Sequence, residues 1–115
     1  MMIKLRHMPK CEIDLDTTFR ALADPTRRAL LGRLSRGPAT VSELGKPFEM
    51  AMPSLMLHLK KLEEAGLIYS KKKGRVRTCF AELGPLEQAV EWLTSHQKLW
   101  QRRLDRLEAF LDEDA

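Results

Sequence analysis

Five cationic side chains lie within seven consecutive positions of the sequence, and no acidic residue interrupts them. They are Lys71, Lys72, Lys73, Arg75 and Arg77, with Gly74 among them. Ammonium and guanidinium groups at this density bind phosphate oxygens, and the phosphates that they neutralise release condensed counterions. Glycine gives the backbone the freedom that a tight turn needs. The cluster therefore predicts a turn that contacts a phosphate backbone. A solvated loop is the alternative for the cluster taken by itself.

Other residues that could perform chemistry are scattered along the chain. The histidines and cysteines that could bind a metal ion occupy five separate segments: His7, Cys11, His58, Cys79 and His96. Metal sites need such ligands close together, and no two of these share a helix turn or a hairpin tip. The sequence also lacks a glycine-rich phosphate loop and a nucleophile elbow. We therefore expect no metal site, no cofactor and no enzyme activity.

Length and composition favour one folded domain. The 115 residues are 43% hydrophobic and 31% charged, which is the balance of a chain with a single core. The net charge of +4 suits a nucleic-acid partner without requiring one. No apolar run reaches the ~20 residues of a membrane span, and the first residues lack the pattern of a secretory signal. A cytoplasmic protein without a membrane partner is expected. Its two cysteines are too few for a disulfide framework, so free thiols are expected.

Hydrophobic spacing and capping residues predict two helices in the first third of the chain. Residues 1–13 show no sustained period and are expected to form a flexible arm. Apolar residues at helical spacing predict a first helix over residues 15–22. Asp24 is a good N-cap and Pro25 suits the first helical position, so a second helix should run to about Ser35.

Two more helices are predicted before the basic turn. Thr40 and Glu43 have the spacing of a capping box, which predicts a third helix from Val41 to about Phe48. A fourth helix is predicted over residues 52–65, where leucines at positions 55, 59 and 62 form one buried stripe and a glycine follows at the end.

Strand-like runs over residues 67–73 and 76–82 flank Gly74 and predict a β-hairpin. In the second run, Cys79 is expected to be a small core residue, and a redox-active thiol is the alternative. Four helices, a hairpin and a last helix form the winged helix-turn-helix plan, in which the hairpin is the wing. The wing is expected to lie along phosphates or to enter the adjacent minor groove, whose negative potential favours arginine. The expected fold class is mostly α with a β-hairpin wing, in the order α-α-α-α-β-β-α, with its core in residues 14–84.

In this plan the fourth helix is the candidate for contacting base pairs, because one helix fits the major groove of double-stranded DNA. Ser54 can hydrogen-bond to a base or phosphate, while Met56 and Leu57 can make only apolar contacts. Packing of Met56 or Leu57 against the preceding helix is the alternative. His58, next to Leu59, is expected to be a partly buried structural histidine. The predicted DNA-binding set is Thr40, Ser42, Pro53, Ser54, Met56, Leu57, Lys60, Lys61, Lys72, Lys73, Arg75 and Arg77.

The last predicted helix, residues 85–111, carries an apolar seam at alternating steps of four and three, broken only by Gln97. This is the pattern of a coiled coil. A small domain cannot easily cover so long a stripe, so a second copy of the chain is expected to cover it. Packing on its own domain is the alternative. The predicted dimer interface is Leu15, Phe19, Leu86, Val90, Leu93, Gln97, Trp100, Leu104, Leu107 and Leu111. Residues 112–115 are expected to form an acidic tail.

Three stretches resemble the ArsR family of bacterial transcriptional regulators. They are FRALADPTRRALLGRL from Phe19, VSELGKPFEMAMPSLMLHLKKLEEAGLI from Val41 and KKKGRVRTCFAE from Lys71. The resemblance covers roughly residues 14–111. It implies a homodimer built on the first and last helices, with each fourth helix in a major-groove half-site and each wing on the flanking backbone. The centres of two DNA half-sites lie about 34 to 36 Å apart, so binding both needs two linked reading helices. A monomer has only one such helix.

Many members of that family sense metals through cysteines in the third helix or through histidine and acid pairs in the last helix. Here the third helix reads VSELGKPF without cysteine, and His96 has no partner histidine, so neither metal site transfers. The resemblance thus implies a repressor that binds a palindromic operator as a homodimer, often that of its own operon. An activator or nucleoid-type protein is the alternative among DNA-binding proteins, and a protein-interaction module is the alternative from another class. The effector ligand is left open.

Overall fold

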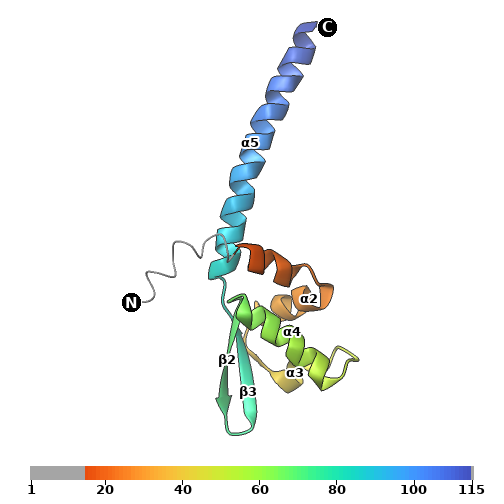
Figure 1. Ribbon diagram of the computed structural model, residues 1–115, viewed down its shortest axis with the longest axis vertical. Helices are drawn as coiled ribbons and strands as arrows, with labels where there is room; N and C mark the ends of the chain where they lie inside the picture. The colour runs from red at the N-terminus through yellow and green to blue at the C-terminus, as the bar shows by residue number, and fades with distance from the viewer. Residues whose placement is uncertain (1–14, 115) are drawn as a thin grey trace, which may run out of the picture.

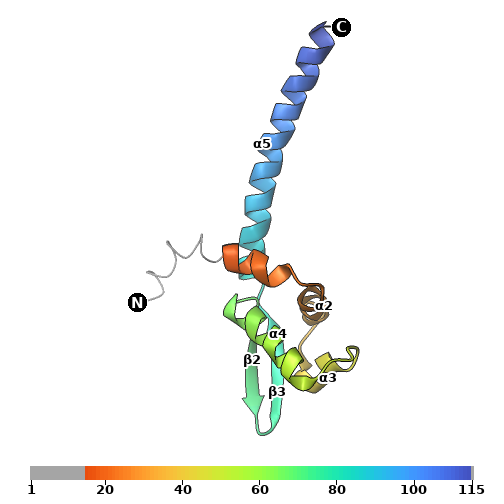
Figure 2. The same ribbon diagram turned by 45° about the vertical axis from the view of Figure 1, so that its right-hand side comes forward.

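The computed structural model describes residues 15–114 of the chain. After a first helical segment over residues 15–22, the elements are α2 (Pro25–Leu34), β1 (Ala39–Thr40), α3 (Val41–Gly45), α4 (Met52–Glu64), β2 (Ile68–Lys73), β3 (Val76–Ala81) and α5 (Gly84–Asp114). The predicted winged helix-turn-helix order is confirmed. Figure 1 shows the hairpin and α5 leaving the helical body in opposite directions, and the turned view in Figure 2 agrees. The predicted flexible arm lies outside the described residues.

The helix starts follow the capping chemistry that the sequence predicts. Asp24 caps α2, since its Oδ2 accepts a hydrogen bond from the backbone N–H of Arg27 at 3.0 Å. Thr40 and Glu43 form the predicted capping box of α3, with bonds of 3.1 and 2.9 Å. The backbone N–H of Arg27 donates a hydrogen bond to the carboxylate of Asp24, and that of Thr40 donates to the carboxylate of Glu43. Each bond stabilises the charged form, so the pKa of each carboxyl is lowered.

The predicted end of α3 near Phe48 is wrong, because the helix ends at Gly45. Pro47 has no N–H to continue the helical hydrogen bonds, so the chain leaves the helix there. The N–H of Phe48 instead donates to the carbonyl of Gly45 at 3.1 Å and closes a turn. The helix is thus a single turn and a half, fixed mainly by its capping box.

α4 ends in a glycine-dependent turn that leads directly into the hairpin. Gly66 has a φ of 75°, which favours glycine. Its N–H donates to the carbonyl of Glu63 at 2.9 Å, and the N–H of Leu67 donates to that of Leu62 at 3.0 Å. This pair of bonds is the Schellman motif. It fixes the position of β2 relative to α4.

The hairpin is confirmed, and its register sets which side chains share a face. In the antiparallel pair, Ser70 lies opposite Cys79 and Lys72 lies opposite Arg77. Gly74 has a φ of 63°, and no non-glycine residue within the described range has a positive φ. These values fit a two-residue type II′ turn with glycine first. The turn therefore needs glycine at position 74.

A third strand, β1, joins the sheet and was not predicted. Ala39 pairs with Cys79 and Thr40 pairs with Thr78, so the strand order is β1-β3-β2. A strand of two residues is too short to show the alternation of period two on which strand prediction depends. Its effect is to join the capping residue of α3 to the wing.

Leucines from several elements form one core beneath the sheet and α4. The predicted stripe of α4 is confirmed, because Leu55, Leu59 and Leu62 are 2%, 4% and 0% exposed. Cys79 is 1% exposed, so its predicted core role is confirmed as well. Burial raises the pKa of the Cys79 thiol, which opposes the thiolate form that redox reactions need.

α5 belongs to the core only at its beginning. Leu86 packs partly against the core and Ala89 is buried, while most side chains further along are exposed. The helix has 31 residues, or roughly 46 Å at about 1.5 Å per residue, and its exposed part projects from the body. Residues 112–114, predicted as part of an acidic tail, continue this helix, because neither glycine nor proline follows Pro85 within it. Among the described helices, none combines the length and apolar character that a membrane span requires.

Candidate nucleic-acid interface

α4 turns most of its predicted reading residues outward. Pro53, Ser54, Lys60 and Lys61 are exposed, and Leu57 is 52% exposed. The alternative that Met56 or Leu57 packs against the preceding helix stays open, because each side chain is also partly covered. Because Leu57 cannot hydrogen-bond, it can contribute only apolar contacts to a surface that docks on α4.

A hollow of about 420 Å³, the α3–wing hollow, lies where α3, α4 and the hairpin meet. Its lining comprises Thr40, Val41, Ser42, Met56, Lys72, Arg75, Val76 and Arg77. Six of these belong to the predicted DNA-binding set, although they are spread over 38 positions of the sequence. The lining contains three cations and two hydroxyls and no carboxylate, which is the donor chemistry that suits a phosphate.

Two of the lining residues were not predicted. Val41 and Val76 carry no polar group, so only the pairing of β1 with β3, which brings the start of α3 beside the wing, places them in the hollow. They add an apolar border to the cationic surface.

The two faces of the wing differ in chemistry. Lys72 and Arg77 are directly opposite in the register and both line the α3–wing hollow. On the other face, Tyr69 and Phe80 stack with centroids 5.0 Å apart, and Nζ of Lys71 lies 5.7 Å from the Phe80 ring centroid. Lys71 therefore extends away from the hollow.

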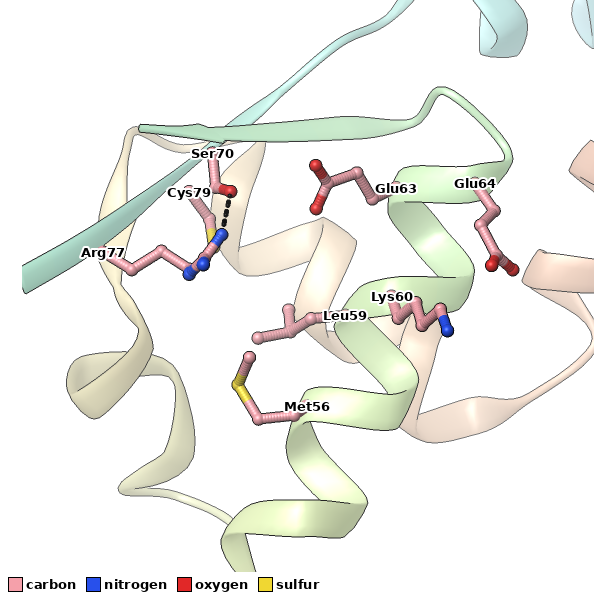
Figure 3. A pocket seen from close by; sticks show the side chains of 8 residues that line it. All are labelled: Met56, Leu59, Lys60, Glu63, Glu64, Ser70, Arg77 and Cys79. Carbon is pink, nitrogen blue, oxygen red and sulfur yellow. Dashed lines mark hydrogen bonds between the residues drawn. The ribbon is translucent and has the colours of Figure 1, made fainter. Parts of the chain in front are cut away.

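Arg77 is more constrained than a freely solvated wing cation. It is half-buried, and its Nη1 donates a hydrogen bond to Oγ of Ser70 at 2.9 Å. Figure 3 shows the guanidinium extended toward Ser70 and Cys79. Ser70 was not predicted as a functional residue, although alternation along β2 places it on the same face as Lys72.

Arg77 and Met56 also line a second recess, the α4–wing groove, which encloses about 500 Å³. The complete lining is Met56, Leu59, Lys60, Glu63, Glu64, Ser70, Arg77 and Cys79. Met56 thus lies between α4 and the wing, and the side chain borders both recesses. Two carboxylates at the C-terminal end of α4 distinguish this groove from the α3–wing hollow.

The opposite flank of α4 is structural. Lys61 borders a small recess with Arg20 and Arg27, away from the wing. The side chain of His58 is 21% exposed, and its Nδ1 lies 3.3 Å from Nη1 of Arg27 and 3.8 Å from Oδ2 of Asp24. The prediction that His58 is a partly buried structural histidine is confirmed.

The remaining candidate metal ligands have other surroundings. His7 and Cys11 lie outside the described residues, while Cys79 is buried in the sheet. His96 stacks on Trp92 with ring centroids 4.1 Å apart, and its Nδ1 lies 2.9 Å from the Trp92 carbonyl oxygen. Within residues 15–114, no three histidine, cysteine or acidic side chains are grouped as they would be around a metal ion.

The seam of the last helix is solvent-exposed in the single chain. Its exposed fractions lie between 50% and 61% for Val90, Leu93, Trp100, Leu104, Leu107 and Leu111, and Gln97 is exposed too. Phe19 is 36% exposed and meets Trp92 edge to face at 6.0 Å, and Leu15 is partly buried. Leu86 packs on its own core, so the free seam starts beyond it.

Comparison with known proteins adds independent information. Residues 22–69 match a family model described as a helix-turn-helix domain. The HTH-type transcriptional regulator Rv2034 of Mycobacterium tuberculosis is 33% identical over 99 residues, which are 86% of this chain and 90% of that protein. The transcriptional repressor SdpR of Bacillus subtilis is 29% identical over 79 residues, covering 69% and 88% respectively. A solved structure described as the ArsR family transcriptional regulator RHA00566 matches with a TM-score of 0.75 and 58% identity, over 78% of this chain and 93% of that one.

Proposed function

The chain belongs to the ArsR family of transcriptional regulators, and from this premise we propose that it represses transcription as a homodimer bound to a palindromic operator. It is a DNA-binding regulator of the helix-turn-helix type. The observation that carries the proposal is the α3–wing hollow, which joins cations and hydroxyls beside the outward face of α4.

The charge along α4 supports one orientation on the duplex. Its basic residues are Lys60 and Lys61, and its acidic residues, Glu63 and Glu64, come last. Carboxylates near phosphates are repelled, so the N-terminal part of α4 enters the major groove and the acidic end stays outside. Ser54 and Leu57 then face base edges, and Lys60 binds a phosphate.

The wing supplies the remaining contacts. Lys72, Arg75 and Arg77 bind the phosphates that flank the groove, with Thr40 and Ser42 as hydroxyl donors. Oγ1 of Thr40 accepts a bond from the N–H of Glu43, and the Thr40 hydroxyl also bonds to the Glu43 carboxylate, so Thr40 exchanges that second bond for one to a phosphate. Lys73 lies next to the turn, where it reaches the neighbouring backbone.

A second copy of the chain covers the seam of α5. The seam projects beyond the body, so its own domain leaves it exposed. Burial of such side chains is favourable by about 25 cal/mol per Å² of apolar surface. The same pairing joins two reading helices at the spacing that a two-fold operator needs.

The choice of repression over activation is inferred from the names of relatives. SdpR is a transcriptional repressor, and a protein of Staphylococcus xylosus that is 33% identical over 61 residues is named an arsenical resistance operon repressor. We assign repression to this chain on that ground. It acts as a DNA-binding protein in the cytoplasm, without enzyme activity.

An electrophoretic mobility shift with the DNA upstream of its own gene tests the proposal. We expect a shifted complex that survives excess competitor DNA, and an affinity that falls steeply as salt is raised, because phosphate contacts release counterions. Transcription from that promoter in vitro should decrease when the protein is added. Binding to no duplex in dilute buffer would overturn the proposal, and increased transcription would overturn its sign.

A further inference from the structure

The α4–wing groove has the size of a small-molecule site. It encloses about 500 Å³, within the range of about 300 to 1,000 Å³ that such sites occupy. Figure 3 shows α4 along one side of the groove and the strands of the wing across its end. The groove therefore lies between two elements that the proposed function places on DNA.

Opposite charges face this groove from two directions. Arg77 extends into it from β3, and Glu63 extends toward it from α4 (Figure 3). Arg77 uses one of its five N–H donors on Ser70. Among residues 15–114, the carboxylate of Glu63 takes part in no hydrogen bond or ion pair. Both groups thus retain capacity for a ligand.

The surface between the two charges is apolar. Met56 and Leu59 point into the groove from α4, and Cys79 lies at its inner wall (Figure 3). Lys60 and Glu64 also border the groove, but their charged ends point to the other side of α4 in the same view. The interior therefore offers one cation, one anion and an apolar floor.

We propose that this groove binds a small organic zwitterion with an apolar body. Its anionic group binds Arg77, its ammonium group binds Glu63, and its apolar part packs on Met56, which is 37% exposed. A simple anion would be repelled by Glu63, and a simple cation would be repelled by Arg77. An apolar α-amino acid has all three features.

Occupancy changes how the wing is held. Arg77 and Met56 border both recesses, so a ligand that engages Arg77 alters the α3–wing hollow as well. This consequence rests on the proposed function, since it requires that the hollow binds DNA. Coupling between two sites is reciprocal, so DNA then changes the affinity for the zwitterion by the same factor.

The test measures binding in the absence of DNA, on the full chain labelled with ¹⁵N. The probes are the L-amino acids valine, leucine, methionine, phenylalanine and tryptophan, each raised to about 10 mM, which reveals even a Kd of about 1 mM. We expect saturable shifts of the backbone amides of Ser70, Arg77 and Cys79 with at least one probe. The absence of such shifts with every probe overturns the proposal.

Analogues and a matched pair of variants test the assignment of the two charges. For the binding probe, the analogue that lacks the ammonium group and the one that lacks the carboxylate should each bind about tenfold more weakly. Glu63→Gln should weaken binding by about tenfold, and Glu64→Gln should leave it unchanged. Equal binding of the analogues, or equal effects of the two variants, overturns the assignment.

Adding the binding probe to a mobility shift then separates this inference from the proposed function. A changed operator affinity supports the coupling, and an unchanged affinity overturns the coupling while the site itself stands. If the chain binds no DNA but binds the zwitterion, the proposed function fails and the site stands.

Discussion

Arg27 of α2 contacts His58 of α4 and so connects these two helices. Its Nη1 lies 3.3 Å from Nδ1 of His58 on α4, while its Nε donates to the carbonyl of Ala21 at 2.7 Å and its Nη2 to that of Arg20 at 3.2 Å. A guanidinium can only donate, so this contact is a hydrogen bond in the tautomer of His58 whose Nδ1 carries no proton. The orientation of α4 thus depends on one side chain of α2.

Replacement of Arg27 should destabilise the fold. Arg27→Met keeps the aliphatic stem but removes every donor of the guanidinium, which takes its bond from the carbonyl of Ala21 and its contact from Nδ1 of His58, while the carbonyl of Arg20 keeps the N–H of Ala23. We expect a loss of about 1 to 3 kcal/mol in the free energy of unfolding, measured by urea denaturation. Arg36→Met is the control, because Arg36 is exposed and its side chain makes no hydrogen bond within the described part. Equal stability of the two variants would contradict the role given to Arg27.

The capping carboxylates predict a loss of stability in acid. Asp24 and Glu43 have ordinary pKa values of 3.8 and 4.5, and backbone N–H groups hold the pKa of each below that value. A depressed pKa gives stability that is fully present above the ordinary value and is lost as pH falls through the folded one. Thermal denaturation should therefore show a falling Tm below about pH 4.5.

The paired variant Asp24→Asn, Glu43→Gln removes both titrating groups, and asparagine still caps a helix. Its Tm should fall less over the same acidic range than that of the unchanged chain. Glu108→Gln serves as control, since that exposed carboxylate on α5 caps no helix. If the paired variant kept the full acid dependence, the caps would not be its source.

The wing arginines should act on every DNA sequence alike. Replacement of Arg75 and Arg77 with alanine removes phosphate contacts, so affinity should fall uniformly and the salt slope should decrease by roughly 0.9 per lost contact. Fluorescence anisotropy at several salt concentrations measures both quantities. Lys71→Ala is a matched control, because Lys71 lies over Phe80 on the other face of the hairpin. A loss confined to one operator sequence would contradict a backbone role.

The reading helix should instead control which base is preferred. Ser54→Ala removes a hydrogen bond donor and Leu57→Ala removes an apolar contact, so each should change the preferred base at one operator position, by about 1 to 3 kcal/mol of discrimination. Competition among single-base operator variants measures the change. Lys60→Ala should weaken all of them equally. An unchanged base preference in both variants would place these side chains away from the bases.

Much of the fold follows from local sequence chemistry, while the candidate site depends on contacts distant in sequence. Thr40 and Glu43 start α3 by a bond pair that spacing alone predicts, and the leucine stripe of α4 is buried as its period requires. The half-burial of Arg77 was not predictable, because it results from the packing of the wing against α4. β1 was missed for the same reason, since its pairing with β3 is not local.

Dimerisation through α5 can be tested with a variant that leaves the fold of the single chain intact. Leu104 and Leu107 are 51% and 53% exposed, so Leu104→Glu with Leu107→Glu should not disturb the core. Full burial of a leucine contributes about 1.5 to 3 kcal/mol, and about half of that remains to be gained when the dimer forms. The four leucines of a dimer then contribute at least about 3 kcal/mol, so dimerisation should weaken at least about a hundredfold. Analytical ultracentrifugation should find a dimer for the unchanged chain at micromolar concentration and a monomer for the variant.

Operator binding should weaken together with the dimer, because a monomer engages one half-site only. Arg102→Glu adds a comparable negative charge to the same exposed helix but lies off the seam, so it should remain dimeric. A dimer that persists in the leucine variant would move the interface elsewhere on the chain. A monomer that still binds the full operator with undiminished affinity would show that the two reading helices do not act as a linked pair.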